Sequence, residues 1–270
     1  MFSSPATVTP MPGSPDRPEP DPDPGADVAL GLNTPALSGI RRLSALDAVR
    51  ARIGLAVDLG LLAPGERLPS SDRIAAALGV GEITARRALV SLCRDGVLER
   101  RRGRTGGTLV AERPARAAAE TTAAFRSDSA AVRRLIDHRL VLECGVAHLA
   151  AARVDDDTLK RLDDLVAEMD EAPSWAEFHS CDERFHLAVA AATGLDSVTE
   201  PYSALLRDLY RYYLPYPMEA LRASNAEHRA LVEALRRHDA AGAADITRRH
   251  VEELHQTMFV GLLGGEADTA

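Results

Sequence analysis

Residues 70–111 limit the possible folds of this chain more than any other segment. They contain two short amphipathic segments that are separated by only three residues. The first segment begins at Ser70 or Ser71, either of which can act as a helix N-cap. A tight turn at 79–81 follows, and a second helix is predicted over 82–94. Two helices joined in this way are typical of a helix-turn-helix, which places its second helix in the DNA major groove.

The residues on either side of this pair predict the rest of a DNA-binding domain. Two strand-like pieces, 97–100 and 108–111, flank a loop rich in arginine and glycine, which indicates a β-hairpin wing. A further helix is predicted around 46–57, where apolar residues recur at helical spacing before a segment with proline and glycine. We therefore predict a winged helix-turn-helix of three helices and a hairpin over 39–113.

Charge is distributed unevenly along the chain. The net charge is −8, yet residues 39–113 contain fourteen arginines against eight acidic residues, and the remainder is acidic. A basic segment beside an acidic one indicates that one domain meets a polyanion and the other does not.

The predicted DNA contacts lie at the start of the second helix and on the wing. Side chains in the first turns of such a helix reach base edges, basic side chains on a wing neutralise phosphates, and glycines let the backbone approach the DNA. The alternative is a solvated charged surface on a helix-turn-helix that contacts protein. The predicted contacts are Thr84, Arg86, Arg87, Arg100, Arg101, Arg102, Arg104, Gly106 and Gly107.

The run GERLPSSDRIAAALGVGEITARRALVSLCRDGVLERRRGRTGGTLV resembles the winged helix-turn-helix of GntR-type bacterial transcription regulators. The match covers about 70 residues with few gaps, although Asp72 and Glu82 stand where that family commonly has arginine. The resemblance implies a DNA-binding transcription regulator. We expect a repressor that acts as a homodimer on double-stranded DNA, at an operator that is a short inverted repeat.

From about 127 the chain becomes a succession of amphipathic segments with few strand signals. They predict an all-α antiparallel bundle over 127–262, so the fold as a whole is mainly α. The helices are expected near 129–152, 155–171, 174–193, 196–214, 218–238 and 241–262. The proline-rich 1–38 and the short 263–270 are predicted to be disordered tails, and 114–126 a linker, with a partly helical segment as the alternative.

Four residues of the predicted bundle form a candidate metal site. Asp182 and His186 are four residues apart and share one face of a helix, and His228 and His250 lie on the inward stripes of the last two predicted helices. Three imidazoles and one carboxylate suit a divalent ion such as zinc, with nickel or manganese as alternatives. The other histidines are expected to be structural.

Several segments of the bundle, among them DHRLVLECGVAHLAA, CDERFHLAVAAATG and AEHRALVEALRRHDAAGA, resemble the FCD effector-binding domain of FadR-like GntR regulators. The resemblance implies that Asp182, His186, His228 and His250 ligate the cation. Arg139 is expected to clamp the carboxylate of a small organic acid, since a guanidinium matches a carboxylate with two parallel hydrogen bonds. The alternative for Arg139 is an internal pair with Glu143, four residues further along.

An enzyme is the competing class: a metal-dependent hydrolase or lyase on a helical bundle, with an accessory DNA-binding domain. The sequence offers no independent nucleophile or clear general base near the predicted ligands, so we predict a regulator that is not an enzyme. No stretch approaches the roughly 18 apolar residues of a membrane span, and no signal peptide is evident. The three cysteines form no CxxC pair, and we expect a cytoplasmic protein without a membrane partner.

Overall fold

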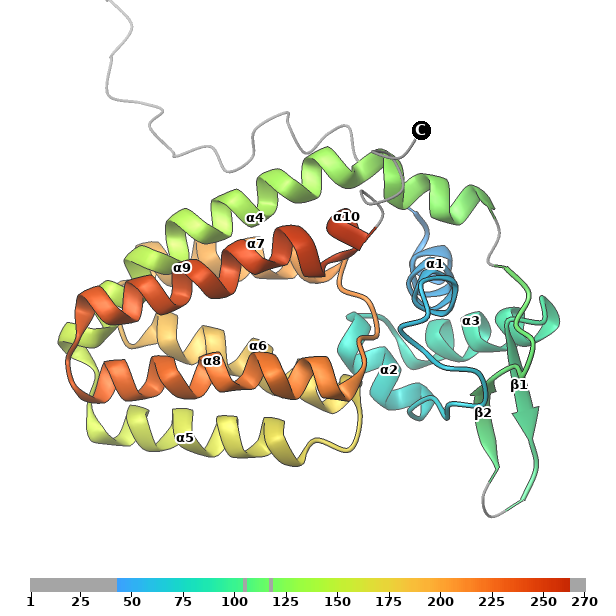
Figure 1. The fold of residues 1–270 in the computed structure, drawn as a ribbon, viewed down its shortest axis with the longest axis horizontal. Coiled ribbons are helices and arrows are strands. Elements are labelled where there is room, and N and C mark those ends of the chain that lie inside the picture. Colours follow the sequence, from blue (N-terminus) through green and yellow to red (C-terminus); the bar gives the residue numbers. More distant parts are fainter. Residues whose placement is uncertain (1–42, 104–105, 117–118, 263–270) are drawn as a thin grey trace, which may run out of the picture. The chain divides into compact units, whose positions relative to one another are not determined.

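The computed structural model of this chain describes residues 43–103, 106–116 and 119–262 (Figure 1). The predicted tails 1–38 and 263–270 lie outside these residues. The fold is mainly helical, with a two-stranded hairpin between the first three helices and the rest, as predicted. In the described part of the chain, none of the helices combines the length and the apolar character that a membrane span needs.

Three helices form the amino-terminal part of the described chain. They are α1 (Ala45–Asp58), α2 (Ser71–Leu78) and α3 (Glu82–Arg94). The Ser44 side chain begins α1 by accepting a hydrogen bond from the backbone N–H of Asp47 at 3.1 Å. Gly79 ends α2 with a φ of 65°, in the left-handed region that glycine adopts at little cost, so the chain turns at once into α3. The predicted helix-turn-helix is confirmed.

The wing is an antiparallel pair, β1 (Leu98–Arg101) and β2 (Gly107–Val110). Its register pairs Leu98 with Val110 and Arg101 with Gly107. The apolar Leu98 and Val110 are buried beneath the helices, whereas the arginine-bearing end is exposed. The hairpin thus presents its charged tip to solvent.

The remaining helices form the predicted bundle. They are α4 (Ala119–Arg153), α5 (Asp156–Glu171), α6 (Trp175–Ala191), α7 (Asp196–Tyr210), α8 (Met218–Arg236), α9 (Ala240–Thr257) and the short α10 (Phe259–Leu262). The long α4 packs chiefly against α9, as Figure 1 shows, and α5 packs against α6 and α8. Residues from α4, α6, α8 and α9 therefore meet in the same interior region of the bundle.

Helix α4 begins about ten residues earlier than predicted, inside the expected linker 114–126. Its 35 residues contain no proline, and no glycine occurs before Gly145. Nothing in the local sequence therefore ends the helix, and the alanines near its start favour it.

Two predicted helix ends at the carboxy-terminal side were wrong. Helix α7 ends at Tyr210 rather than near 214, because Pro215 and Pro217 disfavour helical backbone in the residues before them. Helix α9 ends at Thr257, where Met258 is extended with a ψ of 164° and separates it from α10.

The amino-terminal helices and the bundle share one apolar core. Buried residues of α1, α2 and α3 belong to the same hydrophobic cluster as Phe125, Trp175 and Val251 of the bundle. Arg52 of α1 is also buried, and it donates hydrogen bonds to the backbone oxygens of Tyr213 at 2.7 Å and Tyr210 at 2.8 Å. A guanidinium of one part therefore satisfies carbonyls at the end of α7.

Candidate metal centre and nucleic-acid interface

The exposed face of α3 carries both basic and apolar side chains. Arg86 and Arg87 are exposed, Thr84 is half-buried at their side, and Ile83 and Val90 are 68% and 43% exposed. Large apolar side chains in water suggest a surface that meets a partner, and apolar groups on a groove-reading helix contact thymine methyls. The sequence analysis did not single out Ile83 or Val90; their seven-residue spacing, which places both on one helix face, is the signal.

Part of this basic charge is paired within the chain. The Arg86 guanidinium donates to Glu82 at 2.5 Å, one turn earlier on the same exposed face. On the wing, Arg101 donates to Glu99 at 2.7 Å and to Glu112 at 3.0 Å. The predicted contact Arg101 thus has two carboxylate partners.

The other predicted wing residues have different surroundings. Arg100 and Arg102 are exposed, whereas Arg104 lies outside the described residues. A Cβ on Gly106 would lie 2.3 Å from the backbone oxygen of Arg101, so the hairpin turn itself requires glycine there. Gly107 has a φ of 145°, a conformation that other residues rarely adopt.

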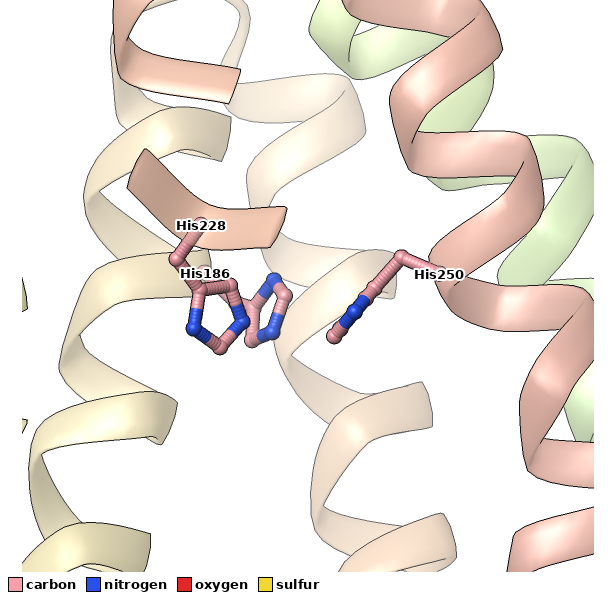
Figure 2. Close-up of side chains that lie close together, drawn as sticks. All are labelled: His186, His228 and His250. Atoms are coloured by element: carbon pink, nitrogen blue, oxygen red, sulfur yellow. The ribbon is translucent and has the colours of Figure 1, made fainter. Parts of the chain in front are cut away.

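Three imidazoles meet in the interior of the bundle. His186 comes from α6, His228 from α8 and His250 from α9, and all three are buried (Figure 2). One possible ligand atom from each lies within 4.8 Å of those of the other two. The structure therefore brings these three predicted ligands together from helices that are far apart in sequence.

Each imidazole has its Nδ1 beside a side-chain oxygen of another residue. The pairs are His186 with Glu143 at 2.5 Å, His228 with Asn225 at 3.2 Å and His250 with Glu227 at 2.8 Å. Carboxylate and amide oxygens accept hydrogen bonds and do not donate, so these partners favour the tautomer with the proton on Nδ1. The Nε2 atoms then carry lone pairs, the arrangement that partners of metal-binding histidines commonly enforce.

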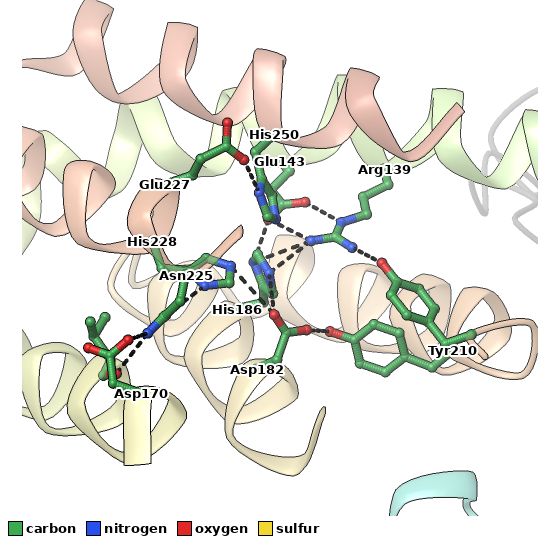
Figure 3. A network of polar contacts seen from close by, with 12 residues as sticks. Arg139, Glu143, Asp170, Asp182, His186, Tyr210, Asn225, Glu227, His228 and His250 are labelled. Atoms are coloured by element: carbon green, nitrogen blue, oxygen red, sulfur yellow. Dashed lines mark hydrogen bonds and ion pairs between the residues drawn. The ribbon is translucent and has the colours of Figure 1, made fainter. Parts of the chain in front are cut away.

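The amide of Asn225 is held in the orientation that this tautomer needs. Its nitrogen donates to the backbone oxygen of Val166 at 3.0 Å and to the Asp170 carboxylate at 2.7 Å (Figure 3). The opposite orientation would turn the amide oxygen toward two acceptors. The oxygen of Asn225 therefore faces His228.

Asp182 supplies a carboxylate beside the imidazoles, one helical turn before His186 on α6. Its Oδ1 lies 3.6 Å from Nε2 of His186 and 3.4 Å from Nε2 of His228. The Tyr210 hydroxyl donates to the other oxygen, Oδ2, at 2.8 Å. Burial disfavours the charge, but His186 and the Arg139 guanidinium outweigh it and hold the pKa of Asp182 well below its usual range.

A divalent cation fits this arrangement. Burial holds the pKa of His228 well below its ordinary value, so its imidazole is neutral. Its Nε2 has no hydrogen-bond partner among the described residues, and it faces the ionised carboxylate of Asp182. A lone pair and an anion at this separation repel each other, and a cation would satisfy both. Three imidazole nitrogens and one carboxylate oxygen suit zinc or a similar ion.

Arg139 lies beside the same group on α4 and is fully buried. Its Nε donates to Glu143 at 2.5 Å, its Nη1 donates to the Tyr213 hydroxyl at 2.9 Å, and its Nη2 lies 2.9 Å from Nε2 of His186. The internal pair with Glu143, the alternative to a carboxylate clamp, is thus formed here. A cation on Nε2 of His186 would have to replace the contact with Nη2.

His179 is another residue of this region that the sequence analysis left as structural. Its ring packs against that of Tyr210 at a tilt of 56°, with ring centroids 4.6 Å apart, and burial lowers its pKa to about 4. It precedes Asp182 by three residues and His186 by seven, which places it on the same helix face. That spacing could have identified it.

The remaining histidines have structural or surface positions. His238 has Nδ1 2.7 Å from the backbone oxygen of Ala151, and His255 has Nε2 3.0 Å from the Asp137 carboxylate. His138 and His148 are exposed.

Comparison with known proteins gives matches over both parts of the chain. Residues 45–110 match the model described as bacterial regulatory proteins, gntR family, and residues 134–253 match the FCD domain. The putative HTH-type transcriptional regulator RmpR of Mycobacterium gastri is 31% identical over 231 residues, which cover 82% of this chain and 84% of RmpR.

Two relatives from Escherichia coli strain K12 align over similar shares. The putative L-lactate dehydrogenase operon regulatory protein is 29% identical over 240 residues, covering 81% of this chain and 87% of its own. The Uxu operon transcriptional regulator is 29% identical over 210 residues, covering 73% and 79%. These relatives are transcription regulators and not enzymes, which is against the hydrolase or lyase alternative.

Proposed function

The chain belongs to the GntR family of bacterial regulatory proteins, with an FCD domain behind a winged helix-turn-helix as in FadR-like members, and we propose that it is a repressor released from its operator by a small organic acid. In this proposal residues 39–113 bind DNA, residues 114–126 connect the two domains, and residues 127–262 bind the effector and form the dimer. The meeting of three imidazoles within the FCD domain carries the proposal that a metal-bound effector controls DNA binding.

The residues that hold the metal in this proposal are Asp182, His186, His228 and His250. When bound, the ion acts as a Lewis acid toward a carboxylate oxygen of the effector. Zinc is the first candidate, and nickel and manganese have compatible ligand preferences.

The charge of the buried groups favours an acid as effector. Arg139, Glu143 and Asp182 together carry one negative charge, and a divalent ion would leave one positive charge that a monocarboxylate neutralises. Nη1 of Arg139 has two hydrogens and one acceptor, the Tyr213 hydroxyl, among the described residues. One N–H therefore remains for the effector. The relative named for the L-lactate dehydrogenase operon supports this ligand class, since lactate is a small organic acid.

The DNA half of the proposal places the exposed face of α3 in the major groove and the wing on phosphates. Two chains related by a two-fold axis would read an inverted repeat, and the effector would shift the population toward a spacing of the two DNA-binding domains that fits the operator poorly.

Selection of binding sites from a pool of random double-stranded DNA tests this half. We expect an inverted repeat to be enriched by a protein that light scattering shows to be a dimer. Arg86→Ala should weaken binding to it by about 1–3 kcal/mol. A monomer that enriches no sequence, and that Arg86→Ala leaves unchanged, would contradict the assignment.

The effector half is tested on the selected DNA with zinc-loaded full chain. Acetate, lactate and longer carboxylic acids should lower DNA affinity, and His228→Ala should remove both zinc binding and this response. His238→Ala, which changes a histidine away from the group, should keep both. An unchanged response in His228→Ala would place the effector site elsewhere.

A further inference from the structure

A cavity of about 390 Å³ extends from the histidine group toward the DNA-binding domain. Arg139, Asp182 and His250 line one part of it, with Glu227 beside them. Arg52 of α1 and Leu78 of α2 also line it, so its wall includes residues of the DNA-binding domain. A ligand that fills this space would touch both parts of the chain.

The lining away from the metal ligands includes the charged side chains of Arg52 and Glu253, but most of it is apolar. The apolar side chains come from α2, α6, α8, α9 and the two segments that follow α7 and α9. They are Leu78, Trp175, Phe178, Leu214, Leu221, Leu254 and Met258. Cavities of this size take ligands well beyond three carbons, and an apolar wall stabilises an apolar body.

Tyr213 joins the two ends of the cavity. Its hydroxyl accepts from Arg139 beside the histidines, and its backbone oxygen accepts from Arg52 of α1. Arg52 is 3% exposed, and no carboxylate contacts it among the described residues. Burial lowers its pKa to about 9, as expected for a guanidinium that only carbonyl oxygens satisfy. A ligand beside Tyr213 therefore lies next to the two hydrogen bonds by which this residue connects Arg139 with Arg52 of α1.

We infer that the effector is an amphipathic carboxylic acid, with an aryl or medium-length alkyl body that lies along this cavity and contacts Leu78 and Trp175. The inference rests on the proposed function, because the acid group is the one that meets the metal and Arg139. A three-carbon hydroxy acid would occupy the polar end and leave the apolar wall unfilled.

The single tryptophan of the chain, Trp175, gives a direct test, because it lies in the apolar wall. The zinc-loaded full chain is titrated with acetate, lactate, butyrate, hexanoate, octanoate and 3-phenylpropionate, and affinity is measured by calorimetry. We expect the dissociation constant to fall about fourfold per buried methylene until the cavity is full. Tryptophan emission should change with hexanoate and 3-phenylpropionate and stay constant with acetate.

Two variants separate the apolar wall from general effects on folding. Leu221→Gln places an amide in the wall and should remove most of the dependence on chain length while acetate binds as before. Val198→Gln changes a half-buried aliphatic residue of α7 outside the cavity and should keep that dependence.

The outcomes distinguish this inference from the proposed function. If acetate and lactate bind but longer acids bind no more tightly and leave tryptophan emission unchanged, the amphipathic class is wrong and the metal-bound acid stands. If none of the acids binds the zinc-loaded protein, the proposed function fails and the inference fails with it.

Discussion

Asn225 is the uncharged member of the residues that hold the imidazoles. Its amide is fully buried, and two acceptors fix its orientation, so it can present only its oxygen to His228. Glu143 and Glu227, the partners of the other two imidazoles, add a negative charge and also fix the orientation of the ring. A substitution of Asn225 therefore tests the effect of the ring orientation without changing the charge of the site.

Replacing this residue tests whether the tautomer of His228 matters for metal binding. Asn225→Ala should lower zinc affinity about 10–100-fold, since loss of a residue that orients a metal-binding histidine has effects of this size. Competition with a chelator of known affinity measures it. Arg229→Ala changes an exposed residue on the same helix as Asn225 and removes its surface pair with Asp170 of α5, and it should leave zinc affinity unchanged. Wild-type affinity in a folded Asn225→Ala protein would mean that His228 is not held in this way.

Glu82 is the acidic residue on the exposed face of α3, which we propose enters the major groove, and its partner is Arg86. Glu82→Gln should free this guanidinium and remove an anion that would face the DNA phosphates. We expect DNA affinity to rise several-fold and its dependence on salt to steepen. Fluorescence anisotropy at several salt concentrations measures both, with Asp95→Asn at the far end of α3 as a control. Weaker binding to the selected site would show instead that Glu82 reads a base.

At the scale of elements, the sequence predicted most helices because their apolar residues recur with helical spacing. It also predicted that Asp182 and His186 share a face, since that follows from a separation of four residues. The start of α4 was placed too late because no local signal separates a helix from a linker in this alanine-rich segment. The end of α7 was placed too late although Pro215 and Pro217 mark a break there, and the break between α9 and α10 was missed because neither proline nor glycine stands at the extended Met258.

The partners of the imidazoles could not be predicted from the same patterns. Asn225 precedes His228 by three residues, but its role depends on the contacts of its amide with α5, which no local spacing encodes. The Glu227 side chain reaches His250 only because α8 and α9 pack together. Glu143 was recognised as a partner for Arg139 at helical spacing, whereas its contact with His186 comes from the packing of α4 on α6.

Arg52 is a polar link between α1 and the end of α7, beside the apolar core that the two parts share. Arg52→Met keeps much of its length and removes the hydrogen bonds to Tyr210 and Tyr213. We expect the free energy of unfolding to fall by about 1–3 kcal/mol, because two carbonyls lose a charged donor. Urea denaturation measures it. Arg50→Met, which removes pairs with Asp47 and Asp95 at the surface, should cost less than about 1 kcal/mol. Equal losses in both variants would contradict a specific link.

At the scale of the whole molecule, the buried histidines couple stability to pH. Burial lowers the pKa of His179 to about 4 and holds that of His228 well below its ordinary value. Between about pH 6.5 and 4 the unfolded chain therefore binds more protons at these two residues than the folded chain does. Their contribution to stability is present above pH 6.5 and is lost as the pH falls toward their folded pKa values.

The metal-free protein should accordingly lose stability from pH 6.5 to 5. His179→Gln should reduce the slope by up to about 1.4 kcal/mol per pH unit, the effect of one proton. Chemical denaturation at half-unit intervals measures the slope. His148→Gln, at an exposed position, should keep the wild-type slope. A slope that His179→Gln leaves unchanged would show that this imidazole is hydrated in the folded protein.

The central claim is that one divalent ion is held by Asp182, His186, His228 and His250. Elemental analysis of the full chain, purified without chelator and with native mass spectrometry on the same sample, tests it most directly. We predict close to one divalent ion per chain in the wild type, most of it zinc, and less than about a tenth of that in folded His228→Ala. A wild-type protein that contains no metal and takes up none from excess zinc would contradict the claim, and so would a His228→Ala protein that keeps its full metal content.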